Sequence, residues 1–225
     1  MVIREHFSAE LRALRERLLE MASATDSMVG QAIQALSERN EILAERVIAS
    51  DDVVDRLDIE IEAECLRLIA QQQPVARDLR FIGTAMKVIT DLERIGDHAV
   101  DIAKIGRKLA QENWTDPLVD LPRMAAMVRS MLGDVMVALV NHDLAKAEAV
   151  AKQDDEVDLL FAQIGEDLYA TMSRNGTNVV RASYLLFAAH YLERIADHIV
   201  NIAERIHFVE RGELSHLAPS HRTGS

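Results

Sequence analysis

Two acidic patterns in this chain place carboxylates four residues apart. Asp51 and Asp55 stand in the segment DDVVD, and Glu93 and Asp97 stand in LERIGDHAVDIA. Residues four apart lie on the same side of an α-helix, where like charges destabilise the helix by about 0.2–0.5 kcal/mol per pair. Bound cations would remove this repulsion, and oxygen-only ligands suit Mg²⁺, Mn²⁺, Ca²⁺ or iron. The spacing therefore predicts a metal site built from carboxylates.

Both patterns occur a second time in the chain. LERIADHIVNIA repeats the Glu93 segment at an offset of 100 residues, and DDEVD repeats the Asp51 segment at an offset of 103. The second set of acids is Asp154, Asp158, Glu193 and Asp197. A single acidic row on a helix is usually only a solvated face, but repetition of the acids together with their apolar neighbours favours a site.

The acids are placed symmetrically about two turn signals. Asp51 and Asp97 are equidistant from Pro74, as are Asp55 and Glu93, and a proline ends a helix. The second set is centred in the same way on Asn175-Gly176. Antiparallel helices rising about 1.5 Å per residue from such a turn place all four acids of a set at matching heights. Each half is therefore predicted to form a hairpin with four facing carboxylates.

The two halves differ one helical turn after the repeated acids. Asp101 continues the first acidic row, whereas Asn201 stands at the equivalent position of the second. The second site should therefore carry less charge and bind metal more weakly. Arg94 and its repeat Arg194 are expected to pair with Asp97 and Asp197 or with a neighbouring helix. His98 and His198 project away from these acids, so we expect a surface or packing role for both.

Apolar residues recur at helical spacing along most of the chain, which predicts an all-α fold. The expected helices span residues 8–37, 41–70, the stretch from Pro74 to about 112, 123–140, 144–172 and 179–210. Trp114, Pro117 and Pro122 mark the linker between the halves. Two tandem, duplicated three-helix bundles result, over residues 1–113 and 114–213, followed by a flexible tail at 214–225.

Composition excludes several other classes. The net charge of −12 argues against a nucleic-acid binder, which needs clustered Lys and Arg. The single cysteine, Cys65, lies on an apolar face and is expected in the core. No uncharged apolar stretch reaches 18 residues and the first residues lack the pattern of a signal peptide, so we expect a cytoplasmic protein.

The repeated LERIGDHAVDIA and YLERIADHIVNIA, the upstream DDVVD and DDEVD, and the connector QQPVARDLR resemble the PhoU family of phosphate-transport accessory proteins over nearly the whole chain. The resemblance implies paired three-helix bundles with multinuclear sites for iron, zinc, manganese or magnesium. Carried over by position, the sites would use Asp51, Asp55, Glu93, Asp97 and Asp101 in the first half, and Asp154, Asp158, Glu193, Asp197 and Asn201 in the second.

The resemblance also implies a function and partners. Members of the family restrain the phosphate-starvation response by linking a phosphate ABC transporter, through its ATPase subunit, to a membrane sensor histidine kinase. We therefore expect a non-enzymatic regulator that reaches the membrane only through its partners. Exposed apolar residues such as Phe7, Phe187 and Tyr191 suggest a homodimer.

Two other functions fit parts of the sequence. A carboxylate-bridged di-metal enzyme would also use helical bundles, but its usual Glu and His three residues apart are missing, because Gly96 follows Glu93 and Ala196 follows Glu193 at that spacing. A metal-free helical adaptor would leave the symmetric acids unexplained. Metal content per chain separates the metal-binding functions from the adaptor.

Overall fold

The computed structural model describes residues 2–112, 120–174, 179–213 and 217, and every regular element in these ranges is a helix. The six helices are α1 (Val2–Glu38), α2 (Glu41–Gln72), α3 (Ala76–Ala110), α4 (Leu121–Asn141), α5 (Leu144–Arg174) and α6 (Val179–Arg211). The predicted all-α class and the six helices are confirmed, with ends that shift by a few residues at most positions and by six at the start of α1. Most of the expected linker, the Asn175-Gly176 turn and nearly all of the tail lie outside the described residues.

Local chemistry explains where the helices break. The side chain of Asn40 accepts a hydrogen bond of 3.0 Å from the backbone N–H of Leu43, which caps the start of α2. Between α2 and α3, Gln73 adopts a left-handed conformation with φ of 46° immediately before Pro74. His142 takes a similar conformation, with φ of 58°, at the end of α4. The predicted breaks near Asn40 and at Pro74 are confirmed.

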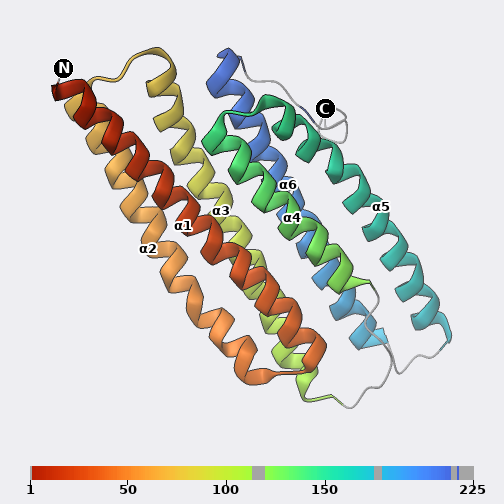
Figure 1. Cartoon of the computed structure of the whole chain (residues 1–225). Coiled ribbons are helices and arrows are strands. Elements are labelled where there is room, and N and C mark those ends of the chain that lie inside the picture. The colour runs from red at the N-terminus through yellow and green to blue at the C-terminus, as the bar shows by residue number, and fades with distance from the viewer. Residues whose placement is uncertain (1, 113–119, 175–178, 214–216, 218–225) are drawn as a thin grey trace.

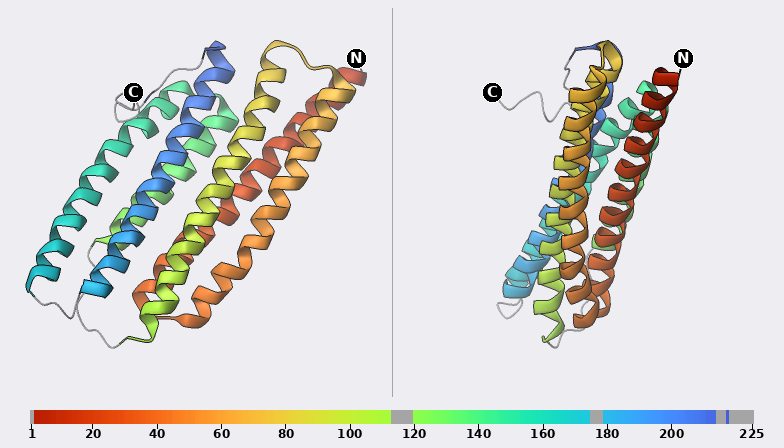
Figure 2. Two further views of the ribbon diagram at one scale, coloured as in Figure 1. Left: turned by 180° about the vertical axis from the view of Figure 1, so that it is seen from behind. Right: turned by 90° about the vertical axis from the view of Figure 1, so that its left-hand side faces the viewer.

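The helices form two layers (Figures 1 and 2). Four of them lie side by side in the order α2, α3, α6, α5, so the two hairpins meet along α3 and α6. Helices α1 and α4 lie next to each other across one face of this layer, each over the hairpin of its own half. The opposite face of the hairpins is left uncovered by any described helix.

The repeated apolar stripe supplies the core of both halves. Leu92, Ile95 and Ala99 of α3 are fully buried, and so are Leu192 and Ile195 of α6. Removing apolar surface from water contributes about 25 cal/mol per Å². The predicted core position of Cys65 is also confirmed, and burial raises the pKa of its thiol to about 12.

Polar and aromatic rings fill the seam where α3 meets α6. The ring of His98 stacks on Tyr191 with 5.5 Å between centroids and lies 5.7 Å from the ring of His198. His198 Nδ1 lies 3.0 Å from a carboxylate oxygen of Asp91. Burial, followed by the proximity of His198, lowers the pKa of His98 to about 4. The predicted packing role of the histidines is confirmed. The expected outer position of Tyr191 is wrong, because its partly buried ring stacks on His98 in this seam.

Helix α4 differs from the others in composition. Among the described helices it is the one long and apolar enough to cross a membrane, but half of the apolar window is buried inside the bundle. Length and composition alone are weak evidence for a membrane span, because the core helix of a soluble protein passes the same test. The other half of the window is not covered by the chain.

Gly106 allows α3 to approach α1 closely. A Cβ atom at this position would lie 3.1 Å from the backbone nitrogen of Leu36 and 3.2 Å from its Cα. We expect Gly106→Val to lower the free energy of unfolding by about 1–3 kcal/mol, because backbone atoms cannot move aside as a flexible side chain would. Urea unfolding followed by circular dichroism measures this change.

Gly83→Val is the matched control, since a Cβ at that helical position meets no atom within 4 Å. It should change the free energy of unfolding by less than about 0.5 kcal/mol. Equal stability of the two variants would contradict the close approach of α3 to α1.

Candidate metal centre

Acids from α2 and α3 face each other across the first hairpin. Asp51 Oδ1 lies 3.7 Å from the position that a Cβ of Gly96 would occupy, so the Asp51 side chain reaches across to α3 beside Asp97. Burial raises the pKa of Asp51 above its ordinary value, and the charges of Asp55 and Asp97 raise it further. A Cβ at this position would make only ordinary contact with Asp51, and the second copy of the motif carries Ala196 here.

Glu93 stands in the same field of negative charge. Burial is the largest cause of its raised pKa, followed by the charge of Asp97, and Asp58 and Asp55 on α2 add to the effect while Arg94 opposes it. The predicted meeting of Asp51 with Asp97 and of Asp55 with Glu93 at matching heights agrees with these couplings. The hairpin therefore brings these carboxylates close together, as their spacing about Pro74 predicts.

Sequence reasoning missed Asp58 as a member of this group. Its pKa is raised by burial first and then by the charges of Glu62 and Asp55. The signal was present in the sequence, because Asp58 lies three residues after Asp55 and therefore on the same side of α2. The duplication does not point to Asp58, because Phe161 stands at the equivalent position of the second half.

The second hairpin repeats the arrangement with α5 and α6. Burial raises the pKa of Glu193, and the charges of Asp197 and then Asp158 raise it further against the opposing effect of His190. Asp154, the counterpart of Asp51, is only 1% exposed. The predicted set of four acids thus spans one hairpin here as well, with Asp154 taken deeper into the protein than Asp51.

The two hairpins differ at one end. Where the first has Asp58 and Thr90, the second has Phe161 and His190, whose rings lie 6.1 Å apart. His190 Nδ1 lies 3.2 Å from Glu193 Oε2. The first hairpin is therefore an all-oxygen environment, whereas an imidazole nitrogen stands beside the acids of the second.

The expected extension of the sites by one more turn differs between the halves. Asp101 pairs with Lys104 at 3.0 Å on its own helix. Asn201 donates a hydrogen bond of 3.4 Å to Asp91, which also contacts His198 in the seam between α3 and α6. The structure thus gives Asn201 an interhelical role in addition to its predicted place next to the second site.

Arginines neutralise part of each acidic row. Arg94 donates to Asp97 at 2.8 Å and Arg194 donates to Asp197 at 2.6 Å, which confirms the predicted pairs. With these side-chain positions, no three His, Cys, Asp or Glu residues of the described chain converge closely enough to hold an ion. The donor set fits hard cations, since every predicted acid offers carboxylate oxygens. Binding would require Asp97 and Asp197 to turn from their arginines into the hairpin.

Comparison with known proteins matches both halves of the chain. The model of the PhoU domain matches residues 18–106 and again residues 121–206. The chain belongs to the PhoU family. The PhoU homolog of Clostridium acetobutylicum, named a phosphate-specific transport system accessory protein, is 40% identical over 211 residues, covering 93% of this chain and 96% of that protein. The homolog of Deinococcus radiodurans bears the same name and is 38% identical over 92% of this chain and 97% of its own length.

Solved PhoU structures share the fold. The crystal structure of PhoU from Pseudomonas aeruginosa superposes with a TM-score of 0.87 at 33% identity, covering 92% of this chain and all of that one. The phosphate transport system regulatory protein PhoU from Streptococcus pneumoniae gives a TM-score of 0.86 at 31% identity, covering 93% of this chain and 99% of that one. These relatives are named as accessory or regulatory proteins of phosphate transport rather than as enzymes.

The clustered acids predict an unusual response to neutralising Glu93. Because its pKa is raised in the folded protein, its ionisation opposes folding, and this destabilisation grows as the pH rises through the raised pKa. We expect Glu93→Gln to raise the free energy of unfolding of metal-free protein at pH 7 by about 0.2–0.5 kcal/mol per like-charge pair removed. The gain should vanish below the ordinary carboxyl pKa. Urea unfolding at a series of pH values measures it.

Added Mn²⁺ should reverse the order of stabilities, because the ion stabilises whichever protein binds it more tightly. Glu166→Gln is the control, since Glu166 is exposed and no acid stands three or four residues away. Loss of stability in metal-free Glu93→Gln, or an equal effect of Mn²⁺ on all three proteins, would contradict a cation site.

Proposed function

We propose that the chain is a metal-binding regulator of phosphate uptake that restrains the phosphate-starvation response. The observation that carries this proposal is that each of the two PhoU-domain matches contains its own hairpin of clustered carboxylates. Burial, followed by the neighbouring negative charges, raises the pKa of Glu93 and of Glu193, so ionisation of these clustered carboxylates is disfavoured. A cation bound in each hairpin would reduce the electrostatic repulsion among its carboxylates.

The residues proposed to hold metal follow from the hairpins. Asp51, Asp55, Glu93 and Asp97 form the first set, with Asp58 and Asp101 at its ends. Asp154, Asp158, Glu193 and Asp197 form the second. Iron, manganese and magnesium suit the all-oxygen set, and His190 makes zinc or iron more favourable at the second. Bound ions would convert a repulsive acidic surface into one that can accept phosphate groups or acidic side chains.

The regulator acts through partners in this proposal. The relatives' names support an association with the phosphate transport system. We infer that the chain works in the cytoplasm, where it couples the ATPase subunit of a phosphate ABC transporter to a sensor histidine kinase. Most of the hairpin acids are at least partly exposed and so accessible to such partners, Asp154 being the buried exception.

A metal-free adaptor is the second candidate, and one observation favours it. Asp97, Asp101 and Asp197 each have a basic partner on their own helix, at 2.6–3.0 Å. These ion pairs lessen the repulsion without any cation. In that case the same partners would be recognised by an acidic surface rather than by bound metal.

Cells lacking the gene test the regulatory role. We expect them to express a phosphate-starvation reporter even in rich phosphate, and the wild-type gene to silence it. The variant Glu93→Gln/Asp97→Asn should silence the reporter less well, because it removes two donors from the first hairpin. The Glu166→Gln gene serves as the control and should silence it fully.

Metal content of each purified protein, measured by mass spectrometry, separates the two candidates. Reduced metal together with reduced silencing supports the metal-binding regulator. Full silencing by a variant that has lost its metal would favour the adaptor, and a reporter that stays silent in the deletion strain would contradict both.

A further inference from the structure

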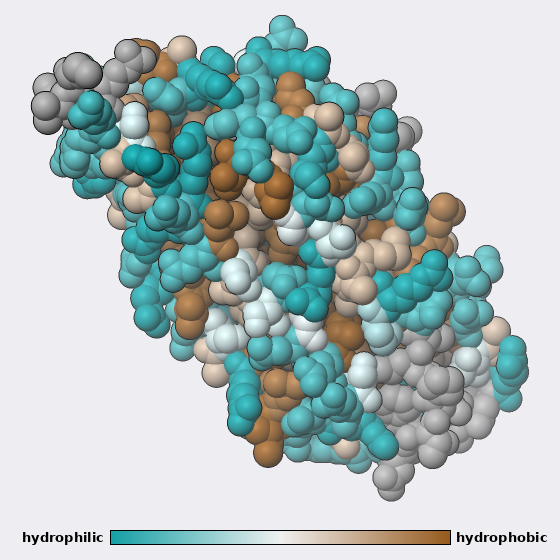
Figure 3. All heavy atoms as spheres, viewed as in Figure 1, coloured by the Kyte–Doolittle hydropathy of each residue, from teal (hydrophilic) through white to brown (hydrophobic). Residues whose placement is uncertain are grey.

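A groove runs between α1 and α4. Its volume is about 250 Å³, and its walls include Leu19 and Ala22 of α1 and Leu132 and Val137 of α4. Leu19 is 38% exposed and Val137 is 45% exposed, so hydrophobic surface remains in contact with water. Gly133 also lines the groove, and a Cβ at this position would meet no atom within 4 Å. Figure 3 shows hydrophobic side chains gathered over this part of the surface.

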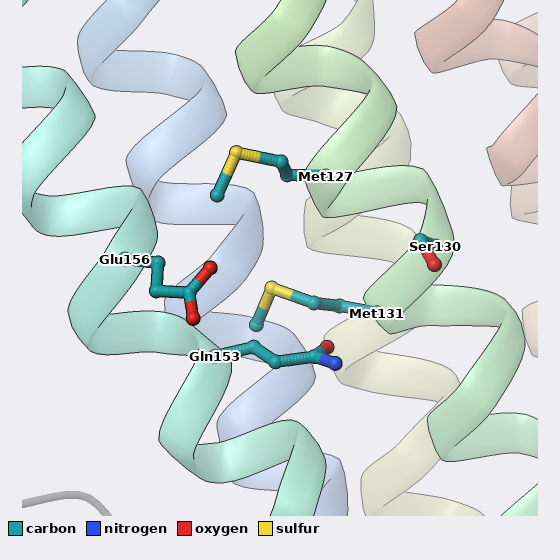
Figure 4. Close-up of a pocket in the computed structure, with 5 residues that line it drawn as sticks. All are labelled: Met127, Ser130, Met131, Gln153 and Glu156. Carbon is teal, nitrogen blue, oxygen red and sulfur yellow. The ribbon is translucent and has the colours of Figure 1, made fainter.

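A second groove of about 180 Å³ lies on the other side of α4. Met127 and Met131 reach from α4 toward Gln153 and Glu156 of α5 (Figure 4). Methionine side chains are flexible and polarisable, and they adapt to the shape of a bound apolar group. Helix α4 thus forms a ridge with a groove on each side, which we call the α4 ridge and define by Met127 to Val137.

The charges of α4 are already matched within the protein. Arg129 makes two hydrogen bonds of 2.7 and 2.8 Å with Asp26, and Asp134 pairs with Lys146 at 2.6 Å. Arg123, before the ridge, lies 3.7 Å from Asp120. The outer surface of the ridge is therefore close to neutral and offers mainly apolar contacts.

Acids border this neutral surface on both sides. Glu16 and Glu20 of α1 are exposed and share a helix face with Leu19 and Ser23, which are three or four residues away. Glu156 is exposed at the edge of the groove on the α5 side. These acids outnumber the exposed bases on the same helix faces, Arg12 of α1 and Lys152 of α5, so the apolar strip has a net negative border.

We propose that the α4 ridge is the docking site for an amphipathic helix of a partner protein whose apolar face is bordered by Lys and Arg. An apolar stripe on such a helix would enter the grooves, and its basic edges would meet Glu16, Glu20 and Glu156. From Met127 to Val137 the ridge is about 15 Å long, which matches about three turns of helix. A second copy of this chain fits poorly, because its acids at the same edges would repel those of the first.

The α4 ridge contains none of the acids proposed to hold metal. Helices α1 and α4 cover one side of the four-helix layer, and the hairpin acids belong to that layer. Docking at the ridge therefore does not depend on metal. The proposal goes beyond the regulatory function proposed above and would survive the loss of the metal sites.

A synthetic amphipathic helix of leucine and lysine, about 15 residues long, tests the proposal by fluorescence anisotropy. We expect it to bind the wild-type protein more tightly than a peptide with glutamate in place of lysine. Gly133→Arg should weaken binding at least tenfold, because it fills the groove and adds positive charge. The open space around Gly133 keeps this substitution compatible with folding.

Ile42→Arg is the matched control, since Ile42 is a 67% exposed apolar residue on α2, a helix that lines neither groove. It introduces the same charge and should leave binding unchanged. Amide chemical shifts on adding the peptide should change along α1, α4 and α5. Equal binding by Gly133→Arg, or shifts confined to Glu93 and Glu193, would overturn the proposal. Sedimentation that shows a wild-type dimer split by Gly133→Arg would assign the ridge to a second copy instead.

Discussion

The packing of α3 against α6 is the constraint on which the rest of the structure depends. Each of these helices carries the repeated apolar stripe, and each is the helix shared between its own bundle and the other one. Because that stripe faces inward, the acids that alternate with it must lie at its edges, beside α2 in one half and α5 in the other. The position of the acids in the hairpins therefore follows from how the core is built. The same packing brings His98 against Tyr191 and His198 against Asp91.

Much of the fold was predictable from the sequence because its signals are local. Proline and asparagine mark the helix breaks, and the spacing of apolar residues identifies the face of each helix that is buried. The equal sequence separation of Asp51 and Asp97 from Pro74 is enough to predict that they face each other. Contacts between helices from different halves could not be predicted in this way. The partly buried ring of Tyr191, for example, stacks on His98 of α3, a contact that no local pattern reveals. Asp58 shows a second limit, since a residue without a counterpart in the other half gains no support from the duplication.

The two halves have diverged at the places that matter for chemistry. In the first, Asp58 and Asp101 extend the acidic row, and the Asp51 side chain lies beside Gly96. In the second, Asp154 is buried, His190 contacts Glu193, and Asn201 contacts Asp91. The shared core keeps both hairpins in the same shape while the donors around each one differ.

The central claim is that carboxylates held at matching heights in each hairpin bind cations. Anomalous X-ray diffraction from crystals grown with Mn²⁺, collected on both sides of the manganese absorption edge, tests it most directly. If the hairpins bind cations, anomalous density will lie between α2 and α3 beside Asp51 and Glu93, and weaker density between α5 and α6 beside Glu193. Density absent from both hairpins at saturating Mn²⁺, with Arg94 still paired to Asp97, would contradict it.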